Sequence, residues 1–297
     1  MSVDGIGVYL RGLNKSKHGT PKQAALKAYN NRISFVAIMT MWQDRYNGKD
    51  RELYSNGKSG ELIARYAEAF AERGISVLLW GFPRGGWESS FVQRFVDVTK
   101  VCDGTIDSWW IDPEVFYKWK GAQAKDLTMR KQPEYAKGVK STGPKQTRYN
   151  QARTLVDLML DAMDESLDVG TTSYGMAMAH KNFPWEVFGG FGVGSPQLYS
   201  VGPVDVKRGV NKWEELGWLT IIPSVPAFGK NSGENMNDHL FKFTQFGELF
   251  VDGFIFWSWR QLDSKEWKIV RTWADWIHNG QIDPKRQIDP KRVYGAV

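Results

Sequence analysis

The stretch SGELIARYAEAFAERGISVLLWGF, residues 59–82, contains one complete helix-then-strand unit. Apolar residues recur at helical spacing from 59 to 73, and Gly74 stands where helices commonly end in a left-handed residue. The apolar run that follows, 75–82, has the length of a buried strand. Because a helix leads directly into a buried strand, the stretch predicts an α/β protein with a parallel sheet.

The same alternation of strand and helix patterns continues in both directions along the 297 residues. Apolar or β-branched runs predict strands at about 5–11, 33–42, 75–82, 105–114, 168–174, 191–199, 218–226 and 252–259. Helical periodicity predicts helices at about 20–31, 59–73, 88–101, 147–165, 182–189, 205–216, 235–249 and 264–278. Eight such units are what a (β/α)8 (TIM) barrel requires, so we expect a single-domain barrel over residues 1–280.

A doubly wound open sheet is the alternative fold for this alternation. Its nucleotide-binding form carries a Gly-x-Gly-x-x-Gly motif directly after the first strand. Here the stretch Gly5-Ile6-Gly7-Val8 lies inside the predicted strand, so the sequence favours the barrel.

Two segments depart from the alternation. The first is a long insert after the fourth strand, residues 116–146, and nine Lys or Arg residues between 118 and 148 face only Asp126 and Glu134. Loops of this length in compact domains are usually functional or disordered. The second is the tail, residues 281–297, which carries Gln-Ile-Asp-Pro-Lys-Arg twice in succession and predicts an extended appendage.

Composition excludes several classes of protein. Hydrophobic residues make up 42% of the chain, which is too many for a disordered protein. No run of about 18 apolar residues is present, so we expect no membrane-spanning helix. Cys102 is the single cysteine and the four histidines are scattered, so we predict no disulfide, bound metal or cofactor. The N-terminus has no secretory-signal pattern, and a cytoplasmic site of synthesis is expected.

Charge and aromatic content point to a class of partner. The net charge of +6 favours an anionic polymer, and the 14 tryptophans favour sugars, whose apolar faces stack on indole rings. No recognisable nucleic-acid-binding module is present, so neither nucleic acid nor a membrane is the expected partner. The predicted partner is a polysaccharide such as a cell-wall glycan.

The candidate site is the stretch Trp110-Ile111-Asp112-Pro113-Glu114, because active sites of (β/α)8 barrels lie at the C-terminal strand ends. Side chains alternate along a strand, so Asp112 and Glu114 are expected to point the same way. Two neighbouring carboxyl groups push their pKa values apart, and one of them can then act as a general acid. Glycosidic cleavage uses such a pair, and we predict Asp112 and Glu114 as catalytic residues.

Other strand ends supply candidate sugar-binding residues. Aromatic side chains at the barrel mouth would form a stacking platform, and an amide and two phenols would hold polar groups of the substrate. The predicted substrate-binding residues are Trp42, Trp80, Trp110, Tyr174, Gln197, Tyr199, Trp257 and Trp259.

The chain resembles glycoside hydrolase barrels in three short motifs: Asp112-Pro113-Glu114, Gln197-Leu198-Tyr199 and Trp257-Ser258-Trp259. Lysozyme-type muramidases close the fourth strand with Asp-x-Glu, and chitinase-like enzymes share that pair and a tyrosine on a later strand. The resemblance implies that Glu114 is the acid and that Asp112 assists it. It also implies cleavage of an N-acetylated polysaccharide, with peptidoglycan foremost. Many such muramidases are phage or bacterial lysins, and a protein without a secretory signal would fit a phage lysin or a virion component.

Two departures from these families leave an alternative open. Muramidases carry an aspartate in strand one, where this chain has Gly7, and the spaced aspartates of chitinases are absent from Asp107-Ser108-Trp109-Trp110-Ile111. The alternative is a barrel that binds carbohydrate, or builds a virion, without cleaving a bond. The exact sugar, the stereochemistry and the oligomeric state do not follow from the sequence.

Overall fold

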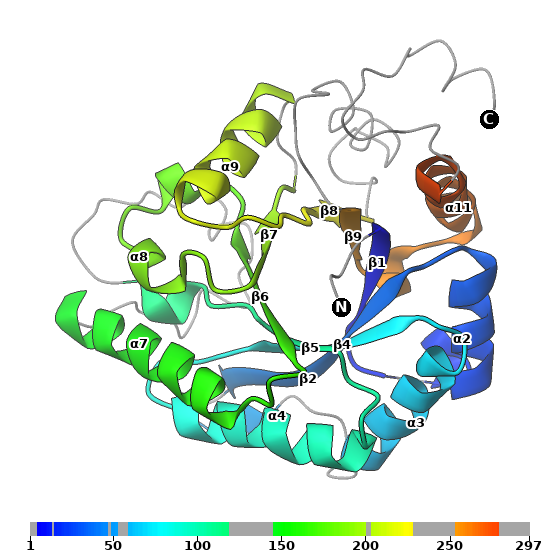
Figure 1. The fold of residues 1–297 in the computed structure, drawn as a ribbon, viewed down its shortest axis with the longest axis horizontal. Helices are drawn as coiled ribbons and strands as arrows, with labels where there is room; N and C mark the ends of the chain where they lie inside the picture. Colours follow the sequence, from blue (N-terminus) through cyan, green and yellow to red (C-terminus); the bar gives the residue numbers. More distant parts are fainter. Residues whose placement is uncertain are drawn as a thin grey trace.

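The computed structural model describes residues 5–13, 15–46, 49–52, 59–118, 145–199, 203–227 and 253–278. The predicted helix at 235–249, most of the insert 116–146 and the tail 281–297 lie outside the described residues. The described chain forms the predicted barrel, with a ring of strands inside and helices outside (Figure 1).

Eight parallel strands close the barrel. Each strand pairs with the next, and β1 pairs with both β2 and β9, so the sheet has no open edge there and the doubly wound alternative is wrong. The strands are β1 Gly5–Leu10, β2 Phe35–Tyr46, β4 Ser76–Phe82, β5 Ser108–Ile111, β6 Asp168–Tyr174, β7 Val193–Gln197, β8 Ser224–Pro226 and β9 Gly253–Trp257. All eight overlap strands that the sequence predicts, although β8 is much shorter than the predicted run 218–226.

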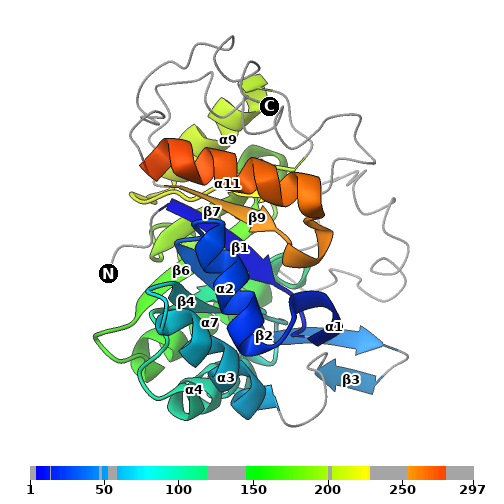
Figure 2. The ribbon, with the colours of Figure 1, turned by 90° about the vertical axis from the view of Figure 1, so that its right-hand side faces the viewer.

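A short hairpin extends β2 beyond the barrel and was not expected from the sequence. Strand β3, Lys49–Glu52, pairs antiparallel with the end of β2 (Figure 2). Its residues are charged and carry no alternating apolar pattern, so periodicity could not predict it.

The helices lie outside the strands, as predicted for a (β/α)8 barrel. They are α1 Lys15–His18, α2 Pro21–Asn30, α3 Ser59–Ala71, α4 Glu88–Cys102, α7 Lys145–Ala162, α8 Trp185–Phe188, α9 Pro203–Glu215 and α11 Ser264–His278, with single 3-10 turns η1 Val115–Tyr117, η2 Ala177–Ala179 and η3 Trp259–Gln261. Thr20 caps α2 in a capping box with Gln23, and Gly74 has the expected positive φ of 68°. No helix in the described ranges is long and apolar enough to span a membrane.

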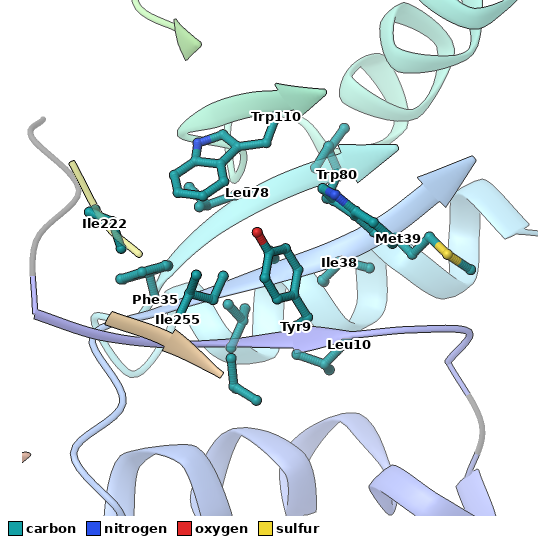
Figure 3. Close-up of a cluster of buried hydrophobic side chains, with 14 of the residues drawn as sticks. Tyr9, Leu10, Phe35, Ile38, Met39, Leu78, Trp80, Trp110, Ile222 and Ile255 are labelled. Atoms are coloured by element: carbon teal, nitrogen blue, oxygen red, sulfur yellow. The ribbon is translucent and has the colours of Figure 1, made fainter. Parts of the chain in front are cut away.

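The barrel interior is filled by large side chains rather than open. Figure 3 shows Tyr9, Phe35, Trp80 and Trp110 converging inside the strands, and all four are buried. Phe35 covers Gly7 so closely that a Cβ atom there would lie 2.1 Å from its ring. The Phe35 ring therefore occupies the space that a side chain at position 7 would need.

Candidate active site

Asp112 and Glu114 follow β5 directly, at the C-terminal end of the fourth barrel strand. The indole of Trp109 donates to Thr99 on α4, at 2.8 Å, and so points outward to the helices. Alternation then directs Trp110 and Asp112 toward the barrel axis, as predicted. The Asp112 N–H donates to the Gly81 carbonyl of β4 at 2.8 Å, which holds this strand end in register.

The two predicted carboxyl groups lie in direct contact. Asp112 is only 5% exposed, whereas Glu114 is partly exposed. A hydrogen bond joins their side chains, and the Gln197 amide donates to Asp112 Oδ1 at 2.9 Å. Burial raises the pKa of Asp112 well above its usual value, the Glu114 charge and hydrogen bond raise it further, and Gln197 opposes the rise. A hydrogen bond between two carboxyl groups needs one proton, so the pair holds a proton between its members.

Two tyrosine hydroxyls complete the polar part of the site. Burial raises the pKa of Tyr199 well above its usual value, and the charges of Tyr9, Asp112 and Glu114 add to the effect. Burial also raises the pKa of Tyr9 to about 12, although its hydrogen bond to Ser224 opposes the rise. Both phenols therefore stay protonated at neutral pH and can donate hydrogen bonds.

The sequence analysis did not identify Tyr9 as part of the site. Its hydroxyl lies 3.2 Å from the Ser224 hydroxyl, which in turn lies 2.8 Å from that of Ser195. This chain of buried hydroxyls links β1 to β8 and β7 inside the barrel. Alternation could have found this residue. Tyr9 lies two residues after Gly7 and therefore shares its face of strand one, which points into the barrel.

An aromatic cluster lies next to Tyr9. The Trp80 and Trp257 ring centroids lie 5.1 Å apart, and each is edge-on to Tyr9, at 5.4 Å and 5.0 Å. Trp80 is fully buried, whereas Trp257 at the end of β9 is partly exposed. Trp257 can therefore present part of its ring to a ligand, and Trp80 supports it from within.

Three predicted platform residues need correction or fall outside the described structure. Trp110 is fully buried, with its ring 6.2 Å from that of Phe35, so it lacks the exposed face that stacking requires. Trp259 lies outside the barrel, where its buried ring packs against Trp267 of α11 at 4.7 Å. The side chain of Trp42 lies outside the described part of the structure.

Tyr174 is at the mouth but its ring is already covered. The His180 ring stacks on it at 3.9 Å, and Lys118 Nζ lies 4.0 Å from the same ring centroid. Groups this near the ring centre cannot share a face, so both faces are occupied. A contribution of Tyr174 to binding would have to come from its hydroxyl.

The described residues contain no group of three or more His, Cys, Asp or Glu side chains that could hold a metal ion. The polar groups that the described structure gathers at this site are the carboxyl pair, Gln197 and the two phenols.

Comparisons with known proteins show the fold. No protein-family model matches the chain, and no curated protein sequence matches it. Solved structures with the same barrel include a β-glycosidase, BGL167, at 12% identity with a TM-score of 0.61, covering 93% of this chain and 96% of that one. A chitinase from Chromobacterium violaceum matches at 10% identity and TM-score 0.56, covering 91% and 99%. A xylanase and α-amylase inhibitor protein from Scadoxus multiflorus matches at 11% identity with a TM-score of 0.56. The match covers 94% of this chain and 99% of that one. The barrel is thus shared with glycosidases and with a protein named as an inhibitor.

Proposed function

We propose that the protein is a glycoside hydrolase that cleaves an N-acetylated polysaccharide, with peptidoglycan as the foremost candidate. The observation that carries the proposal is the interacting pair of a buried Asp112 and a partly exposed Glu114 at the barrel mouth. Burial and the neighbouring carboxyl group raise the pKa of Asp112 and so favour retention of a proton by the pair, and glycosidic cleavage needs such an acid.

The geometry suggests how the pair divides its roles. Retaining glycosidases with a carboxylate nucleophile hold their two carboxyl groups about 5–5.5 Å apart, and inverting enzymes about 6.5–9.5 Å. Asp112 interacts directly with Glu114, which fits an assisting role for Asp112 beside the acid. This favours substrate assistance, in which the sugar's own acetamido group attacks.

In the proposed reaction Glu114, the partly exposed member of the pair, delivers the shared proton to the glycosidic oxygen while the bond from that oxygen to C1 breaks, and Asp112 is left as a carboxylate. The acetamido carbonyl oxygen of the same sugar forms a bond to C1 and closes a ring. The Asp112 carboxylate, held by Gln197, stabilises the positive charge that develops on the acetamido nitrogen. Water then attacks C1, its proton returns to the Glu114 carboxylate, and the acetamido group is released.

Substitution of the acid tests the proposal. Purified protein is incubated with peptidoglycan, chitin oligosaccharides and hyaluronan, and the products are quantified by mass spectrometry. Glu114→Gln keeps the shape of the side chain and removes its acid, so cleavage should fall by about 10²–10⁴. Glu61→Gln, at the start of α3 and outside the site, is the matched control and should leave the rate unchanged.

A carbohydrate-binding barrel without catalysis is the second candidate. The structural match to an inhibitor protein and the absence of a strand-one carboxylate at Gly7 favour it. In that case the wild type would bind the glycans and release no product from any of them. Product release that depends on Glu114 would exclude it.

A further inference from the structure

A second group of side chains lies at the same end of the barrel, on the loop after β4. A turn closed by the Trp87 N–H and the Arg84 carbonyl, at 3.1 Å, brings these two residues together. The Arg84 guanidinium lies 5.9 Å from the centroid of the Trp87 ring and 5.6 Å from that of Phe116. Trp87 is 43% exposed, which is far more than Trp80, Trp110 or Trp259. The loop therefore presents an indole and a cation together at the surface.

A second arginine reaches this loop from α7, which lies beside α4 (Figure 1). At Gly85, a Cβ atom would lie 2.9 Å from Arg148 Nη1 and 2.8 Å from Gln151 Oε1. Arg148 Nη1 donates to Gln151 Oε1 at 2.9 Å, which fixes the direction of the guanidinium. Only glycine leaves room for Arg148 to lie against the residue that follows Arg84.

Within the described part of the chain, the charged groups at this loop are mainly positive. Arg84 and Arg148 are close enough to repel each other, and this repulsion contributes to lowering the pKa of Arg148, after burial as the main cause. Glu88 is the acidic group beside Arg148, and burial raises the pKa of its carboxyl group. Among the described residues around Arg148, two guanidinium groups lie near one carboxyl group, beside an exposed indole.

The group formed by Arg84, Trp87 and Arg148 is connected to the proposed catalytic pair through two chain segments. Gly81, whose carbonyl accepts from Asp112, precedes Arg84 by three residues, a span of at most about 10 Å. Phe116 follows Glu114 by two residues and contacts Phe82 at 5.7 Å between centroids. A glycan chain whose scissile bond lies at Glu114 can thus reach Trp87 with a neighbouring sugar.

We propose that Arg84, Arg148 and Trp87 form a subsite for a carboxylate-bearing sugar unit next to the cleavage point. Trp87 stacks on the sugar ring, and Arg84 binds the carboxylate with Arg148 adding to the positive field. The inference rests on the proposed function and narrows it: the substrate is an acidic N-acetylated glycan. The carboxylate belongs either to a uronic acid or to the lactyl-peptide part of peptidoglycan.

Binding, measured without turnover, tests the subsite. Isothermal titration of Glu114→Gln protein uses three probes: hyaluronan oligosaccharides, soluble peptidoglycan fragments and neutral chitotetraose. Adding Arg84→Gln should weaken binding of an acidic probe by about 10- to 100-fold, the loss expected for a charge-assisted hydrogen bond, and should change chitotetraose binding by less than threefold. Trp87→Ala should weaken acidic and neutral probes alike, because stacking does not depend on charge. The acidic probe that loses affinity with Arg84→Gln identifies the carrier of the carboxylate.

The chain offers a matched control at another aromatic-arginine pair. Arg73, in the turn after α3, lies 5.6 Å from the Tyr29 ring centroid, and Tyr29 is exposed. Arg73→Gln removes the same charge and should leave all affinities unchanged. Two results would overturn the subsite. One is that Arg73→Gln and Arg84→Gln weaken binding of the acidic probe equally. The other is that Arg84→Gln weakens binding of chitotetraose as much as binding of the acidic probe. If the wild type cleaves these glycans while Arg84→Gln has no selective effect, the subsite alone fails. If the wild type neither cleaves nor binds these glycans, both the subsite and the proposed function are refuted.

Discussion

Replacing Asp112 with Asn should make the folded protein more stable at neutral pH. The carboxyl group is 5% exposed and lies against Glu114, and both effects raise its pKa in the folded state. An acid with a raised folded pKa favours the native state at low pH, below its unfolded pKa of about 3.9. Stability is then lost as the pH rises toward the folded pKa, because the native state must ionise a buried group.

The size of the effect follows from the pKa difference. Each unit by which the folded pKa exceeds the unfolded one costs about 1.4 kcal/mol at pH values above both. Asparagine carries no charge to bury, and its amide oxygen can still accept from Gln197. We expect Asp112→Asn to gain on the order of 1 kcal/mol or more at pH 7.5, which raises the Tm by about 2–4 °C. Activity should be lost in the same variant.

The assay is differential scanning calorimetry from pH 3.5 to pH 8. The gain in Tm over the wild type should be near zero at the acid end and grow with pH. Asp164→Asn is the matched control, because backbone and side-chain hydrogen bonds to Ser166 lower the pKa of that exposed carboxyl group. Its effect on Tm should be small and opposite in sign. An Asp112→Asn effect that does not change with pH would refute the reasoning.

Further substitutions test other parts of the account. Gln197→Leu removes the donor that opposes the raised pKa of the carboxyl pair, so ¹³C NMR titration should show a higher pKa. Gly7→Ala places a Cβ against the Phe35 ring and should cost about 1–3 kcal/mol in urea unfolding. Trp259→Ala should cost about 3–5 kcal/mol of stability and leave glycan affinity unchanged, whereas Trp257→Ala should weaken glycan binding.

The strand positions followed from the sequence because a barrel strand is buried on both faces. Continuous apolar runs such as 75–82 therefore identify strands without help from the rest of the chain. The inward direction of Asp112 was also predictable. Side chains alternate along a strand, so knowing the direction of one residue of the strand is enough. Strand β3 has no such apolar run. It forms by pairing with the extended end of β2, and that pairing leaves no periodic pattern in the sequence.

The side chains around the carboxyl pair could be predicted only in part. Gln197 was expected near the pair from its strand end, and its contact with Asp112 agrees with that expectation. Trp110 and Trp259 also lie at strand ends, yet one packs inside the barrel and the other under α11. Whether a tryptophan at a strand end is exposed depends on how deeply the strand is set and on what covers it. Neither property is local to the sequence.

The anomeric configuration of the first product tests the central claim most directly. A β-linked N-acetylated oligosaccharide is cleaved while ¹H NMR follows the new reducing end before mutarotation. The proposed substrate-assisted reaction displaces a group at C1 twice, once by the acetamido oxygen and once by water, so the account predicts the β-anomer from the wild type. Glu114→Gln should give about 10²–10⁴ less product. Initial formation of the α-anomer, or an unchanged rate in Glu114→Gln, would contradict it.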